Sequence, residues 1–164
     1  MQGGFISYGL VAALAIALLF AAFTDLRRRQ IDNWLNAGIA LTAPLFWLST
    51  GLALSDIGWH LAVAIGSFVA LFGLFAMNAM GGGDVKLLTA LALWLEPMWF
   101  LRMLMVMAVA GGVLTIAFGA WHVTRRRKGR IAIPYGVAIS GAALWALAAQ
   151  YLPALSWAGR TIGT

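Results

Sequence analysis

Long apolar runs limit what this chain can fold into, because six of them follow one another with only short polar connections. Five have the length that a helix needs to cross a bilayer, roughly 17 to 25 residues. They cover residues 5–24, 34–50, 59–80, 103–123 and 131–152. A shorter run extends from Asp84 to Leu95. With 63% hydrophobic and 10% charged residues, the chain has more apolar surface than a soluble domain of 164 residues can bury.

These runs predict an all-α polytopic membrane protein with six transmembrane helices in one bundle. The connections are too short for an extramembrane domain, and no repeat interrupts them, so residues 1–164 are interpreted as a single integral-membrane domain. The chain has no cysteine, which excludes disulfides, thiolate metal sites and a cysteine nucleophile. His60 and His122 are expected at opposite membrane faces and cannot share a metal.

Positive charge falls on alternate connections and so predicts the topology. Arg27 to Arg29 follow the first run, Lys86 follows the third, and a cluster from Arg125 to Arg130 precedes the last. The positive-inside rule makes this side cytoplasmic and places both termini outside. Topology therefore accounts for the excess of 11 basic over five acidic residues, and nucleic-acid binding is not expected. The basic residues are expected to meet anionic lipid headgroups at the cytoplasmic face.

Acidic residues at a membrane boundary are costly and usually functional. Asp56 and Glu96 lie in predicted outer connections, where a solvated charge is the expected role. Asp25, Asp32 and Asp84 all fall at the predicted cytoplasmic boundary. Two acids from different helices, Asp25 and Asp84, can therefore meet.

The run that begins at Asp84 is short and follows three glycines, Gly81, Gly82 and Gly83. Its apolar part covers only about 18 Å of a hydrocarbon core that is roughly 30 Å thick. Such irregular, glycine-rich segments are tolerated in membranes where the backbone lines a cavity within the protein. Asp84 is thus expected to start below the membrane surface.

Two carboxylates in a secluded site favour aspartic-protease chemistry, in which one acts as general base on water and its protonated partner polarises a carbonyl. Glycines beside Asp84 would let an extended peptide approach closely. The helix dipole favours an anion at the amino end of a helix, which suggests Asp84 as the base, and disfavours one at the carboxyl end, which suggests Asp25 as the acid. The positive charges of Arg28 and Arg29 oppose this assignment. Lys86 is expected to reach the headgroups and not the acidic pair.

The quoted residues resemble the type IV prepilin peptidase family of membrane aspartic proteases. Gly81 to Asp84, followed by Val85 and Lys86, is similar to that family's GxGDxK signature. Asp25, with its trailing arginines and Asn33, resembles the segment of the first catalytic aspartate. Pro134, Tyr135 and Gly136 resemble the opening of its last helix. GxGD alone is a weak motif, but its combination with Asp25 and the topology is specific.

The resemblance implies a bacterial inner-membrane enzyme that cleaves leader peptides of prepilins or pseudopilins on the cytoplasmic side, using water and no cofactor. Asp25 and Asp84 would be catalytic, and Gly81, Gly82, Gly83 and Lys86 would lie along the substrate's approach. Asp32, Asn33 and residues 134–136 are secondary candidates. The chain lacks the cysteine-rich segment of larger members, so it resembles the short form associated with tight-adherence (Flp-type) pili.

One departure from the family pattern is Asp32, which stands where proline is usual. It could tune the acidic pair or contact substrate, but a solvated charge that caps the second helix is the favoured interpretation. Two other functions stay open. A small ion or solute transporter would use the aspartates as cation ligands, and a non-enzymatic pilus-assembly component would tolerate the loss of either.

Overall fold

The computed structural model describes the backbone of residues 4–124 and 134–161, and the side chains of residues 4–121 and 134–151. The Arg125 to Arg130 cluster lies outside the described residues, as do residues 131–133 of the predicted last span. Every element in the described part is an α-helix, which confirms the all-α prediction. The helices are α1 (Phe5–Arg28), α2 (Asn33–Thr50), α3 (Leu54–Ala76), α4 (Gly82–Ala92), α5 (Pro97–Thr124) and α6 (Tyr135–Thr161).

Three of these helices, α1, α3 and α5, are long and apolar enough to cross a membrane. Large apolar side chains cover their outer surfaces, including Ile65, Phe72 and Ile116, which are 65%, 51% and 74% exposed. A soluble monomer rarely exposes such continuous apolar surface. By contrast, α4 has 11 residues and is about 17 Å long, shorter than a hydrocarbon core. Six helices are therefore confirmed, while six membrane spans stay a prediction.

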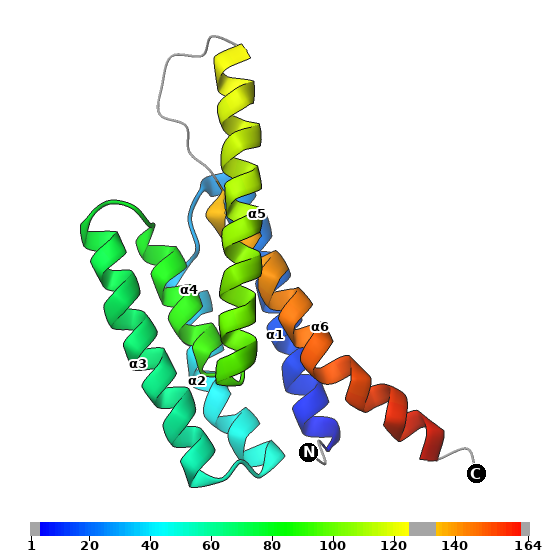
Figure 1. The fold of residues 1–164 in the computed structure, drawn as a ribbon. Helices are drawn as coiled ribbons and strands as arrows, with labels where there is room; N and C mark the ends of the chain where they lie inside the picture. Colours follow the sequence, from blue (N-terminus) through cyan, green and yellow to red (C-terminus); the bar gives the residue numbers. More distant parts are fainter. Residues whose placement is uncertain (1–3, 125–133, 162–164) are drawn as a thin grey trace.

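The helix connections divide between the two ends of the bundle (Figure 1). The connections α1–α2 and α3–α4 lie at the upper end in Figure 1, next to the start of α6. The connections α2–α3 and α4–α5 lie at the lower end, together with the start of α1 and the far end of α6. Segments distant in sequence, namely the end of α1 and the starts of α4 and α6, thus come to one end of the molecule.

The short helix α4 forms the centre of the bundle, in contact with α2, α3, α5 and α6. Leu87, Leu88 and Leu91 have no exposed surface at all. They pack in one apolar core with Leu18 of α1 and Ile139 of α6. Burial of each such side chain stabilises the fold by roughly 1.5–3 kcal/mol relative to a polar surrounding.

Two tryptophans attach the end of α4 to α2. The indole Nε1–H of Trp94 donates a hydrogen bond of 2.8 Å to the Ile39 carbonyl, and that of Trp47 donates one of 2.9 Å to the Leu93 carbonyl. Trp94 is only 2% exposed, and its ring stacks on Phe46 with centroids 5.0 Å apart. Because both indoles are hydrogen-bonded, large aromatic side chains can be buried here without an orphaned donor.

The beginning of α4 is held by glycine contacts and by Asn36 of α2. A Cβ atom on Gly83 would lie 3.3 Å from the Ile31 Cβ, and one on Gly82 would lie 3.2 Å from the Phe75 ring. The Asn36 amide donates a 3.3 Å hydrogen bond to the Gly83 carbonyl. The glycines therefore let the start of α4 pack tightly between the α1–α2 connection and α3.

We expect Trp94→Phe to lower the thermal unfolding midpoint of the purified protein in detergent by several degrees. The substitution keeps an aromatic ring but removes the buried hydrogen bond to Ile39, which contributes about 1 kcal/mol. Trp34→Phe is the matched control, because Trp34 is 63% exposed. Equal midpoints for the two variants would contradict a structural role for the Trp94 hydrogen bond.

Candidate active site

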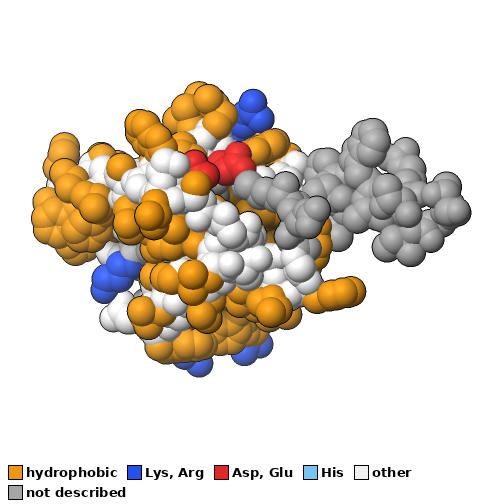
Figure 2. Space-filling model, turned by 90° about the horizontal axis from the view of Figure 1, so that it is seen from below, with side chains coloured by type: hydrophobic (Ala, Val, Ile, Leu, Met, Phe, Trp, Pro, Cys, Tyr) orange, Lys and Arg blue, Asp and Glu red, His pale blue; other side chains and the backbone are white. Residues whose placement is uncertain are grey.

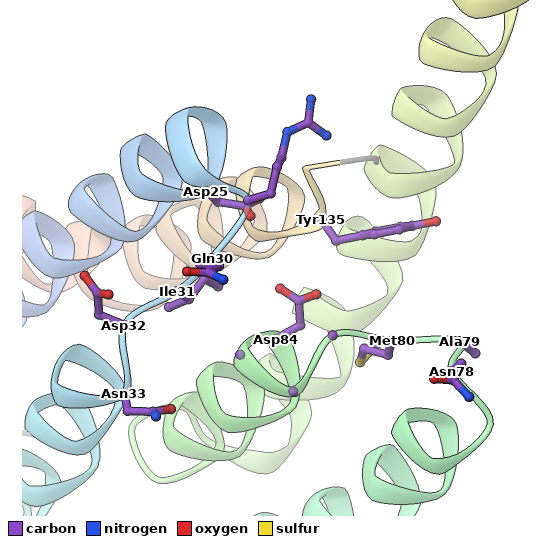
Figure 3. A pocket seen from close by; sticks show the side chains of 14 residues that line it. Asp25, Gln30, Ile31, Asp32, Asn33, Asn78, Ala79, Met80, Asp84 and Tyr135 are labelled. Carbon is purple, nitrogen blue, oxygen red and sulfur yellow. The ribbon is translucent and has the colours of Figure 1, made fainter. Parts of the chain in front are cut away.

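A cavity of about 680 Å³ opens at the upper end of the bundle, where α1 ends and α4 and α6 begin. Its lining combines polar side chains with the glycine backbone before α4 (Figure 3). The lining residues are Asp25, Arg29, Gln30, Ile31, Asp32, Asn33, Asn78, Ala79, Met80, Gly81, Gly82, Gly83, Asp84 and Tyr135. Both predicted catalytic aspartates are among them.

Asp25 lies in the last turns of α1 and is 6% exposed. It packs directly on the first turn of α6, since a Cβ atom on Gly136 would lie 2.9 Å from its Cγ and Oδ2 atoms. The backbone N–H groups of Gly136 and Val137 face its carboxylate. Its Oδ2 atom has no hydrogen-bond partner among the described residues. This oxygen is thus buried without a compensating donor.

Asp84 lies in the first turn of α4, which is not one of the helices long enough to span a membrane. Burial, together with repulsion from the Asp25 carboxylate, raises the pKa of Asp84 to about 6, and the Gly81 backbone N–H partly offsets this rise. A Cβ atom on Gly81 would lie 2.9 Å from the Asp84 Oδ2 atom. Asp84 therefore keeps its proton at pH values well above the usual pKa of an aspartate side chain.

The two carboxyl groups come from different helices and face the same space, with the Asp84 side chain directed toward Asp25 (Figure 3). Each also lies at the amino end of a helix: Asp84 at that of α4, and Asp25 at that of α6. The sequence placed Asp25 only at the carboxyl end of α1. Because the amino end of a helix favours an anion, the helix-end argument for Asp84 as base and Asp25 as acid no longer separates the two residues.

Asp32 lines the same cavity, but its carboxylate points away from Asp25 and Asp84 (Figure 3). It occupies the N-cap position of α2, yet its side chain makes no capping hydrogen bond. Next to it, the Asn33 Oδ1 atom accepts a 2.8 Å hydrogen bond from the Lys86 Nζ atom. Lys86 is not among the residues that line the cavity. Asn33 and Lys86 thus connect α2 with α4 outside the acidic pair.

The segment from Pro134 to Gly136 does contribute to the site. Tyr135 lines the cavity, and its hydroxyl lies 3.2 Å from the Thr115 Oγ1 atom of α5. A Cβ atom on Gly111 would lie 3.3 Å from the Tyr135 ring, so this glycine admits the ring against α5. Pro134 precedes α6 and is fully buried. This segment therefore positions the first turn of α6 against Asp25.

Several residues of the site were not singled out from the sequence. Arg29, Gln30 and Asn78 line the cavity. Asn36 does not line it but donates a hydrogen bond to the Gly83 carbonyl. Asn36 is 4% exposed, and its signal in the sequence is a lone amide within an otherwise apolar run. Arg29 and Asn78 both have positive φ, 55° and 57°, and so end their helices at the cavity's edge. Within the described residues, no three His, Asp or Glu side chains are grouped as a metal site would require.

Comparison with known proteins agrees with the geometry of this site. The model of the type IV leader peptidase family matches residues 12–116, a segment that contains Asp25, the three glycines and Asp84. No curated protein and no solved structure gives a significant match to the chain. The family match covers well over half of the sequence and includes every residue that lines the cavity except Tyr135. The chain therefore belongs to the type IV leader peptidase family.

Proposed function

We propose that this protein is a membrane aspartic endopeptidase that removes leader peptides from type IV prepilins, with Asp25 and Asp84 as its catalytic pair. One observation carries the proposal: two carboxyl groups from separate helices face one cavity at the same end of a bundle whose surface is apolar. Family membership supports the peptidase activity and the prepilin substrate class. In this proposal the two carboxyl groups act as the general acid and the general base of peptide hydrolysis.

The electrostatics favour Asp25 as the base and Asp84 as the acid, the reverse of the assignment from helix ends alone. Repulsion from an ionised Asp25 contributes to the raised pKa of Asp84, so Asp84 holds the proton of the pair. Burial opposes negative charge on Asp25, and the N–H groups of Gly136 and Val137 offset part of that cost. The resting pair thus has one proton, which is the form that aspartic catalysis requires.

In this mechanism Asp25 takes a proton from a water molecule while the water oxygen attacks the peptide carbonyl carbon. Asp84 donates its proton to the carbonyl oxygen, which gives a neutral diol intermediate. When the C–N bond breaks, the leaving amine takes the proton from Asp25, and a diol hydroxyl returns a proton to Asp84. Both carboxyl groups end in their starting states.

The glycines before α4 suit a peptide substrate. Gly81 and Gly82 line the cavity without side chains, so an extended peptide can lie against their backbone. The substrate's cut site must be unwound, because a helical peptide bond is screened by its neighbours. The connections between the helices have no cysteine-rich segment, which supports a short-form enzyme for Flp-type pilins.

We also propose that all six helices lie in the bacterial inner membrane, with both termini outside and the cavity toward the cytoplasm. The positions of Arg27 to Arg29 beside the cavity end support this orientation. The α4 helix contributes to this arrangement together with its flanking connections, since it is too short to span alone.

We expect Asp25→Asn and Asp84→Asn each to reduce processing of a co-expressed Flp-type prepilin by about a thousandfold or more. Each substitution keeps the side chain's size but removes the acid or base. Processing is measured as the size shift of the pilin in membranes, at matched enzyme levels. Asp32→Asn is the control, because it makes the same chemical change in the same cavity on a carboxylate that points away.

Retained cleavage in either catalytic variant would rule out the two-carboxylate mechanism. If all three Asn variants cut like wild type, the acids are not catalytic. If the wild type inserts normally but cuts no prepilin, a transporter or an assembly role would replace the peptidase proposal.

We expect kcat/KM for leader cleavage to fall as pH rises through about 6, by about tenfold per pH unit above it. Above this pH Asp84 loses its proton, both carboxylates are ionised, and no proton donor faces the carbonyl. The measurement is cleavage of a detergent-solubilised prepilin between about pH 5 and 8. A rate that instead rises through about pH 6 would mean that ionised Asp84 is the base.

We expect Gly136→Ala to reduce cleavage by about a hundredfold, because the added Cβ atom would lie 2.9 Å from the Asp25 carboxyl and must displace it. Gly141→Ala is the matched control on the same helix, since a Cβ there meets nothing within 4 Å. Both variants are compared by thermal midpoint and by cleavage rate. Wild-type activity in Gly136→Ala would show that Asp25 does not depend on this contact.

A further inference from the structure

A second cavity, of about 430 Å³, lies at the opposite end of the bundle. Its walls come from the end of α2, the start of α3, the α4–α5 connection and the far part of α6. The residues that line it are Phe46, Leu52, Asp56, Trp59, His60, Trp94, Glu96, Pro97, Met98, Gln150 and Tyr151. We refer to this space as the outer cavity. The volume is that of a small-ligand pocket, and the proposed peptidase chemistry makes no use of it.

The outer cavity brings together two acidic residues that were expected from the sequence to lie in separate, solvated loops. Asp56 and Glu96 both line it, and Figure 2, which views this end, shows acidic side chains grouped in one place. No lysine or arginine is among its described lining residues. The charge of these carboxylates is therefore not balanced by a basic residue within the cavity.

The other polar side chains of the outer cavity include His60, Gln150 and Tyr151. His60 is 4% exposed, and its Nδ1 atom lies 3.4 Å from the Ala92 carbonyl oxygen. A carbonyl can only accept, so Nδ1 is the donor of this contact. The Gln150 Oε1 atom is buried without a partner among the described residues, because its amide nitrogen is directed to the Tyr151 hydroxyl at 3.2 Å. Orphaned acceptors at this depth require a donor.

Aromatic faces complete the walls. Trp94 donates its Nε1–H to the Ile39 carbonyl, and its ring, which is 2% exposed, stacks on Phe46 beneath the cavity. Trp59 and Phe46 add further ring surface. Aromatic faces attract cations, with about 0.5–2 kcal/mol per contact depending on desolvation. Two carboxylates beside the exposed Trp59 ring together match a cation that carries several N–H donors.

We propose that the outer cavity binds a primary ammonium group, and that its source is the ethanolamine headgroup of a phospholipid. A primary ammonium has three N–H donors for the acceptors described above. The cavity lies where the apolar helices α3 and α5 begin. Exposed apolar side chains lie around the cavity: Trp59 is 65% exposed, Met98 59% and Leu54 86%. An amine held there comes attached to acyl chains, as at a membrane surface with aromatic residues at headgroup level.

The test is lipid binding by the purified full-length protein in detergent. Phosphatidylethanolamine, phosphatidylcholine and phosphatidylglycerol with identical short acyl chains are titrated, with tryptophan fluorescence and native mass spectrometry as readouts. We expect the ethanolamine lipid to bind at least about tenfold more tightly than the glycerol lipid, because the carboxylates repel an anionic headgroup. The choline lipid, which has a cation but no N–H donor, should fall between them.

Glu96→Gln and Asp56→Asn should each reduce this preference by about fivefold or more, and the double variant should abolish it. Asp32→Asn is the charge-matched control, since it removes one carboxylate at the opposite end and should keep the preference. Unchanged thermal midpoints without lipid show that the variants are folded.

Equal binding of the three lipids by the wild type would overturn the ammonium site. A preference that persists in the double variant would overturn its location in the outer cavity. If free ethanolamine at millimolar concentration displaces the lipid completely, the phospholipid is not the source and that assignment falls. Because binding and not cleavage is measured, these outcomes are independent of the proposed peptidase activity.

Discussion

The fixed position of α4 is the constraint on which the rest of this structure depends. The helix is short and almost wholly buried, and α2 holds it at both ends: Asn36 bonds to Gly83 at its start, and Trp47 bonds to Leu93 at its end. Since side chains in an apolar interior pack at crystal-like density, a helix fastened at two points cannot slide. Asp84, in its first turn, therefore has a defined distance from the end of α1.

The second half of the arrangement is the contact between Asp25 and the first turn of α6. Gly136 brings the backbone of α6 against the carboxyl group, so that three helices meet at one acid–acid pair. Each aspartate has a glycine packed against its carboxyl group, since Gly81 lies against Asp84 as Gly136 lies against Asp25. Backbone N–H groups then take the place of the water that would otherwise solvate each carboxyl, without a side chain that would fill the cavity.

Much of this could be predicted from the sequence, because hydrophobic length and the few acidic residues carry strong signals. Six helices among the described residues and membership of the peptidase family are confirmed. Asp25 and Asp84 line one cavity, while their catalytic role stays a prediction. Contacts between distant segments left no such signal. Nothing local to Gly136 indicates that it touches Asp25, and nothing in the connections of Asp56 and Glu96 indicates that they share a cavity. The raised pKa of Asp84 likewise depends on burial by neighbouring helices, which only the packed bundle provides.

The burial of α4 also bears on the permeability of the membrane around this protein. Two polar cavities open at opposite ends of the bundle, and α4 stands between them with Leu87, Leu88 and Leu91 fully buried. An ion that crossed from one cavity to the other would have to enter this apolar layer, at a desolvation penalty of several kcal/mol or more. The helix that carries Asp84 thus also separates the two cavities electrically, so that water could enter the proposed active site without a leak of protons.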